Sequence, residues 1–112
     1  MSDKQLPGRE RIEHALEFLA HSASEIGAAK ARVVKAEKML GHIEALMMQA
    51  SDEKAQDARK ADARGSQRYL AAINELSDAT SEVSRLYALR EAAVMRIEVW
   101  RTECATRRAY PA

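Results

Sequence analysis

Apolar residues recur at steps of three and four along the first half of the chain, which is the spacing of one face of an α-helix. Two steps of three meet around Ile26 and Ala29, which predicts a stammer, a local overwinding of a coiled-coil seam. The pattern predicts one long helix over residues 9–49, after a flexible arm over residues 1–8 that ends in Pro7-Gly8. The apolar face of this helix comprises Ile12, Leu16, Leu19, Ala23, Ile26, Ala29, Val33, Ala36, Leu40, Ile43, Met47 and Ala50.

Residues 50–65 interrupt the pattern, because they contain charged residues and alanines but no large apolar side chain. Ser51 followed by two acids suits the N-terminus of a helix, and Gly65 suits a C-terminal end. We expect this tip to be either a short solvated helix or a mobile connector. A second long helix is expected over residues 66–106, followed by a tail over residues 107–112. Its apolar face comprises Tyr69, Ile73, Leu76, Thr80, Val83, Tyr87, Val94, Ile97, Trp100 and Cys104.

The second helix has more apolar surface than one partner helix can cover. Four further residues widen its apolar face, namely Leu70, Leu86, Leu89 and Ala93. We therefore expect an all-α fold, an elongated antiparallel helical hairpin of coiled-coil type, in a single domain of residues 1–112. The surplus surface indicates a further helix–helix contact, either in a homodimeric four-helix bundle or with another protein.

The composition favours long helices over a compact core of bulky side chains. The 112 residues are 46% hydrophobic and 31% charged with a net charge of +1, which excludes a disordered tail as the main content. Only 4% of the residues are aromatic, so alanine supplies much of the apolar count. The single Cys104, the lack of a signal peptide and the short apolar cluster at residues 46–48 predict a cytoplasmic protein without a membrane span.

The sequence contains no motif of an enzyme. His14, His21 and His42 are separated by seven and twenty-one residues, which is too far for neighbouring ligands of one metal ion on a helix. Cys104 lies on the apolar face of the second helix, where a free cysteine behaves as a small hydrophobic residue. The sequence therefore predicts a non-enzymatic protein that needs no cofactor, no metal and no small-molecule substrate.

Trp100 and the arginines near the C-terminus are the candidates for contact with a partner. Trp100 is either a contact anchor or the residue that fills the end of the bundle core, and Tyr87 and Arg101 complete the predicted partner-binding set. Arginine beside aromatic residues is also typical of proteins that bind single-stranded nucleic acid. A solvated, salt-bridged helix face explains this pattern as well. The candidate nucleic-acid contacts are Arg90, Arg96, Arg101, Arg107 and Arg108.

Two stretches carry a resemblance to a known class of proteins. Residues 51–54 (Ser-Asp-Glu-Lys) with the Ala- and Arg-rich segment after them, and residues 97–102 (Ile-Glu-Val-Trp-Arg-Thr), resemble small helical proteins encoded by tailed bacteriophages and prophages. The resemblance implies a phage accessory protein acting in the host cytoplasm, and it implies no catalytic residue. The expected function is a protein-interaction module. The alternatives are an accessory nucleic-acid-binding protein of phage replication or recombination, and a small inhibitor of a host defence system.

Overall fold

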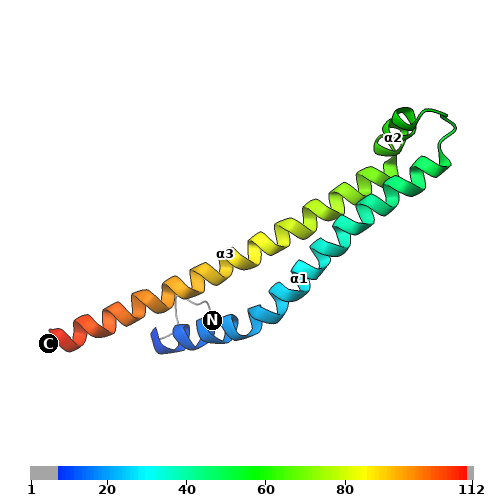
Figure 1. Cartoon of the computed structure of the whole chain (residues 1–112). Coiled ribbons are helices and arrows are strands. Elements are labelled where there is room, and N and C mark those ends of the chain that lie inside the picture. The colour runs from blue at the N-terminus through cyan, green and yellow to red at the C-terminus, as the bar shows by residue number, and fades with distance from the viewer. Residues whose placement is uncertain (1–7, 111–112) are drawn as a thin grey trace. The chain divides into compact units, whose positions relative to one another are not determined.

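A computed structural model describes residues 8–110, and these residues form three α-helices and no strand. Helix α1 covers Gly8–Ala50, α2 covers Gln56–Arg64 and α3 covers Gln67–Ala109 (Figure 1). The predicted all-α helical hairpin is confirmed. Of the predicted arm only Gly8 lies within the described residues, and it begins α1. Of the predicted tail, residues 107–109 are helical.

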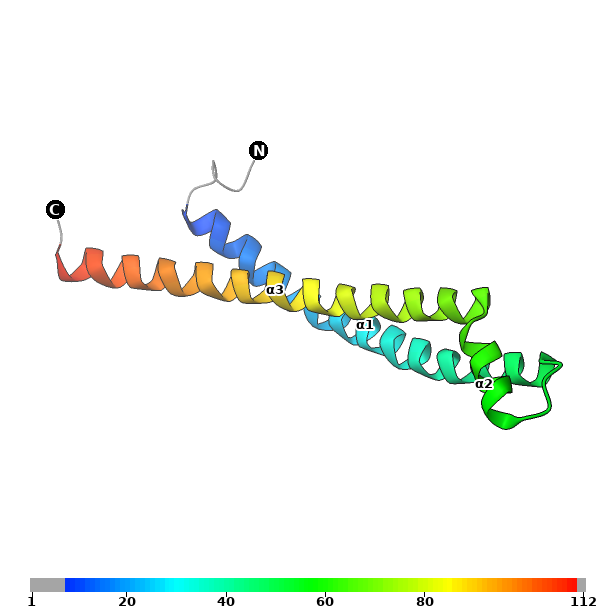
Figure 2. The same cartoon turned by 90° about the horizontal axis from the view of Figure 1, so that it is seen from above.

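The chain divides into two compact units, and each contains a segment of both long helices. Unit 1 combines Met1–Ile26 with Arg85–Ala112, and unit 2 is Gly27–Ser84. Within each unit the α1 and α3 segments run side by side in opposite directions (Figures 1 and 2). Unit 2 also contains α2, which connects the two long helices.

The buried face of α1 follows an uninterrupted heptad pattern, in which steps of three and four alternate. The predicted stammer is therefore wrong. It arose because Ala23 was assigned to the face, whereas Ala23 is exposed and its neighbour Ser22 is buried. Leu16 was assigned to the face in the same way, but it is 52% exposed and the small Ala15 is buried instead. The buried or half-buried positions that follow this pattern are Ile12, Ala15, Leu19, Ser22, Ile26, Ala29, Val33, Ala36, Leu40, Ile43 and Met47, and five further residues are half-buried outside it, namely Gly8, Phe18, Glu44, Leu46 and Met48.

The buried face of α3 has the same alternation. Four residues of the predicted apolar face are exposed, namely Ile73, Thr80, Tyr87 and Val94. The buried or half-buried positions that follow this alternation are Tyr69, Ala72, Leu76, Ala79, Val83, Leu86, Arg90, Ala93, Ile97, Trp100 and Cys104, and Glu82 is half-buried beside them. We call the facing positions of α1 and α3 the seam. Many of its residues are alanines, and short side chains at a helix contact let the two backbones approach closely.

A polar contact within the seam of unit 1 fixes which residues lie opposite each other. The Ser22 hydroxyl donates to the carbonyl oxygen of Leu19 at 3.1 Å, and Nη1 of Arg90 donates to Oγ of Ser22 at 3.4 Å. A polar residue at a seam position typically specifies the register of a coiled coil, because every other register leaves it without its partner. Ser22 and Arg90 are therefore at the same level of the hairpin.

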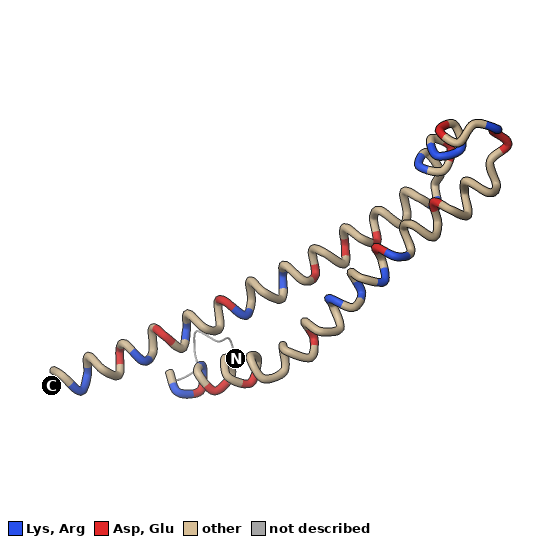
Figure 3. Tube along the Cα trace, viewed as in Figure 1, with Lys and Arg blue, Asp and Glu red and all other residues tan. Residues whose placement is uncertain are grey.

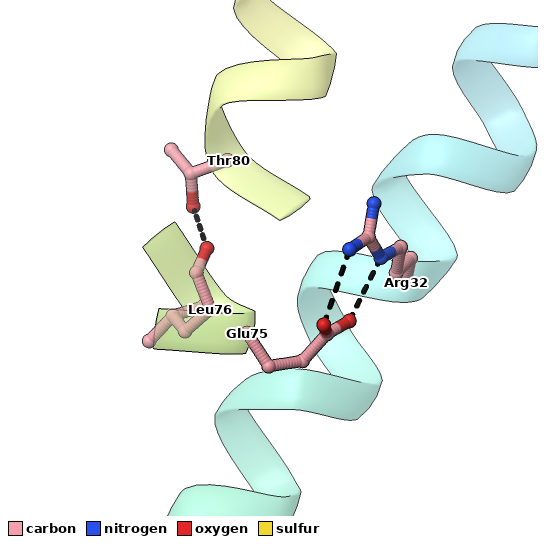
Figure 4. Close-up of polar contacts among 4 residues, drawn as sticks. All are labelled: Arg32, Glu75, Leu76 and Thr80. Atoms are coloured by element: carbon pink, nitrogen blue, oxygen red, sulfur yellow. Dashed lines mark hydrogen bonds and ion pairs between the residues drawn. The ribbon is translucent and has the colours of Figure 1, made fainter. Parts of the chain in front are cut away.

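Charge on the two helices of unit 2 is complementary. Figure 3 shows Lys and Arg positions gathered on the α1 segment and Asp and Glu positions on the α3 segment beside it. Arg32 donates from Nε and Nη2 to the two carboxylate oxygens of Glu75, at 2.8 and 3.1 Å (Figure 4). These hydrogen bonds lower the pKa of Glu75 and raise that of Arg32. The two-pronged geometry favours this antiparallel register.

The tip of unit 2 differs in detail from the sequence prediction. Ser51 does not cap α2, which begins after Ala55 without a side-chain cap; instead its hydroxyl donates to Asp62 at 2.7 Å and accepts from the amide of Glu53. The buried residue of α2 is Ala63. The capping serine is Ser66, whose hydroxyl accepts from the amide of Tyr69 at 3.2 Å at the start of α3.

Candidate interaction surface

Unit 1 has an apolar groove where α1 begins. The groove has a volume of about 560 Å³, and we name it the Trp100 groove. Trp100 lines the groove and is half-buried, and a Cβ placed on Gly8 would lie 3.6 Å from Cδ1 and Nε1 of the indole. The lining residues are Gly8, Arg11, Ile12, Ala92, Met95, Arg96, Val99, Trp100 and Glu103.

Two large apolar side chains beside Trp100 are mostly exposed to solvent. Met95 is 61% exposed and Val99 is 52% exposed. Neither residue is a seam position, so α1 does not cover them. Exposed apolar residues gathered beside a half-buried tryptophan are typical of protein-binding sites, where an aromatic anchor is surrounded by contacts that exclude water.

The structure does not gather the three predicted partner-binding residues at one site. Tyr87 lies on the exposed face of α3 that also contains Val94. Trp100 belongs to the seam and to the Trp100 groove. Arg101 makes an ion pair with Glu98, with 3.5 Å between Nη1 and Oε1. Trp100 therefore packs near the end of the seam and also lines a groove open to solvent, and its role as a contact anchor stays a prediction.

The five candidate nucleic-acid contacts are divided among three places. Arg90 is in the seam against Ser22, and Arg96 lines the Trp100 groove. The other three line a shallow hollow at the end of α3 together with Trp100 and Cys104, namely Arg101, Arg107 and Arg108. The five arginines thus form no single basic stripe, although three of them share the C-terminal hollow.

Sequence reasoning missed Met95 and Val99 as surface residues of interest. A signal for them exists, because Ala92, Met95, Val99 and Glu103 follow one another at helical spacing beside the seam. The apolar face assigned from the sequence lay on the opposite side of the seam, at Ile73, Tyr87 and Val94. That assignment left this side of α3 without an interpretation.

Within residues 8–110, no cluster of three or more His, Cys, Asp or Glu side chains is placed to hold a metal ion. The three histidines lie on the exposed surface of α1. Cys104 is a free, half-buried thiol. In the described part of the chain, no helix combines the length and the apolar character that crossing a membrane requires.

The chain matches no protein-family model, no curated protein sequence and no solved structure.

Proposed function

We propose that this protein is a non-enzymatic interaction module that binds a helix of another protein in the Trp100 groove. The observation that carries the proposal is the exposure of Met95 and Val99 beside Trp100 on α3. Burying exposed apolar area on association contributes about 25 cal/mol per Å², and a groove between two helices matches the apolar face of a third.

The rim of the groove indicates the chemistry of the partner. Arg11 and Arg96 lie on the rim with Glu103, so charges of both signs surround an apolar floor. Such a rim contributes to specificity and to the rate of association more than to affinity. The partner we propose is therefore an amphipathic helix with one apolar face. The resemblance to phage-encoded proteins makes a protein of a bacterial cytoplasm the first class of partner to test, including a component of a host defence system.

The test is a pull-down from a bacterial lysate with the tagged full-length chain, with and without nuclease, read by mass spectrometry. The bait is compared with two variants, Met95→Glu in the groove and Leu70→Glu as a matched control, since Leu70 is a 50% exposed residue in unit 2. We expect a captured protein that survives nuclease treatment, is lost with Met95→Glu and is retained with Leu70→Glu. Equal capture by both variants would exclude the Trp100 groove as the binding site.

The competing function is nucleic-acid binding through the C-terminal hollow. Arg101, Arg107 and Arg108 share that hollow with Trp100, which is the combination of cations and an aromatic ring that stacks bases. This function predicts binding of single-stranded oligonucleotides that weakens steeply with salt and upon replacement of the three arginines by alanine. Fluorescence anisotropy at two salt concentrations distinguishes it from the proposed protein binding, which tolerates salt.

A further inference from the structure

A second apolar groove lies in unit 2. It has a volume of about 340 Å³ and is formed by α1 and α3. Val34 stands at its edge with 50% of its surface exposed. The lining residues are Lys30, Val33, Val34, Glu37, Thr80, Val83 and Ser84.

The charges beside Val34 are arranged so that this face of α1 is complementary to itself. Lys30 precedes Val34 by four residues and Glu37 follows it by three, and both are exposed on the same side of the helix. A two-fold axis through Val34 would place a second α1 antiparallel to the first. Measured along the helix from the two-fold axis, Lys30 then lies ~6 Å away and Glu37 of the second copy ~4.5 Å away in the same direction, given a rise of 1.5 Å per residue. Each lysine therefore faces a glutamate.

The same axis also relates the two glycines within α1. Gly27 lies seven residues before Val34 and Gly41 seven residues after it, so Gly27 of one copy faces Gly41 of the other. A Cβ at either position would meet nothing within 4 Å, so the fold of one chain does not require a glycine at either place. Glycine disfavours a helix interior relative to alanine. Close approach of a second helix backbone explains why glycine is present at both positions.

We propose that the protein forms a two-fold symmetric dimer in which the α1 segments of unit 2 pack antiparallel across Val34. In this dimer Val34 of each chain lies over the groove of the other, Lys30 pairs with Glu37, and Gly27 meets Gly41. An interface of this kind is isologous, with the same surface patch used by both copies. It uses none of the residues of the Trp100 groove.

Sedimentation equilibrium of the full-length chain at micromolar concentrations tests the proposal. We expect reversible dimerisation, and at least a tenfold weaker dimer for the double variant Gly27→Ala, Gly41→Ala. The same variant should melt at a higher temperature than the natural chain when both are dilute enough to be monomeric, because alanine favours the helix. This opposite response of dimer and monomer separates a contact effect from simple misfolding. Gly65→Ala, outside the interface, serves as the control and should leave the dimer unchanged.

Exchanging the charges of Lys30 and Glu37 provides a second test of the dimer. Lys30→Glu and Glu37→Lys should each weaken the dimer, because each places like charges opposite one another, and the double exchange should restore most of the affinity. A chain that remains monomeric at 100-fold higher concentration would overturn the proposal. So would a dimer whose dissociation constant does not change in the glycine variant, or single charge variants that the double exchange does not rescue.

Discussion

Arg90 occupies a position in the seam that an apolar residue usually fills. Its guanidinium reaches Ser22, whose hydroxyl also donates to the carbonyl of Leu19 and therefore keeps a partner if Arg90 is replaced. A half-buried cation loses part of its hydration and gains one long hydrogen bond in return. Such residues specify which register forms while lowering the stability of that register.

Replacing Arg90 by leucine should therefore raise the free energy of unfolding by about 1 kcal/mol, since a partly buried leucine gains a fraction of its transfer free energy. Urea denaturation followed by circular dichroism measures the change. Arg68→Leu, at an exposed position of the same helix, is the control and should stay within about 0.5 kcal/mol of the natural chain. A loss of stability in Arg90→Leu would mean that Arg90 contributes more through its contacts than its desolvation costs.

The ion pair between Arg32 and Glu75 makes stability depend on pH. Because the folded state lowers the pKa of Glu75, the ionised carboxylate stabilises the fold above its unfolded pKa. That contribution is lost as the pH falls through the lower, folded pKa. Thermal melts should thus show Glu75→Gln below the natural chain at neutral pH, with the difference vanishing in acid.

Glu17 is exposed on α1 in unit 1 and provides the comparison for Glu75. Glu17→Gln should show little difference at either pH. Added salt should reduce the neutral-pH difference for Glu75→Gln, because both side chains of the pair are near the surface and are screened. A difference for Glu75→Gln that persists in acid would indicate a packing effect and not an ionic one.

At the scale of the elements, the sequence predicted the two long helices to within three residues at each end, but it assigned the wrong faces. Periodicity analysis prefers the larger apolar residue wherever two neighbours compete, as with Leu16 over Ala15 and Ile73 over Ala72. Packing in this hairpin makes the opposite choice, because close approach of two backbones favours the smaller side chain. Hydrophobicity alone does not show which of two neighbouring residues is buried, since the partner helix determines that choice.

The start of α3 provides a test of a local signal that was assigned to the wrong serine. Ser66 accepts from the amide of Tyr69, so Ser66→Ala should lower the free energy of unfolding by about 1 kcal/mol. Ser51→Ala removes only exposed contacts in the connector and should cost a few tenths of a kcal/mol. Chemical denaturation of the two variants measures and compares their free energies of unfolding. A larger loss of stability for Ser51→Ala than for Ser66→Ala would contradict this prediction.

For the whole molecule, the register leads to a prediction about length. Counting along both helices from the Ser22–Arg90 contact places residues 30–36 of α1 at the same levels as residues 76–82 of α3. Deleting both segments removes one heptad from each helix and keeps every remaining level matched. We expect a cooperative thermal transition in the double deletion. Deleting residues 30–36 alone should lower the melting temperature further, because it moves Ser22 away from Arg90.

The same register explains why only part of the candidate site could be predicted from the sequence. Trp100 was identified from its residue type and from its place near the end of the apolar face. The groove around it depends on where α1 begins, and Gly8 lies against the indole only because of the antiparallel register. The dispersal of the five arginines has the same origin, since Arg90 belongs to the seam and no feature of the arginine spacing reveals this.

The alanines of the seam have a consequence for the response of the protein to temperature. Ala15, Ala29, Ala36, Ala79 and Ala93 are buried, yet each exposes only one methyl group to water when the chain unfolds. Newly hydrated apolar area is the main source of the heat capacity increment of unfolding, which is ~12–15 cal/mol/K per residue in ordinary globular proteins. Calorimetry should give a value below that range here. The curve of stability against temperature would then be shallow, and the hairpin would lose little of its stability on cooling.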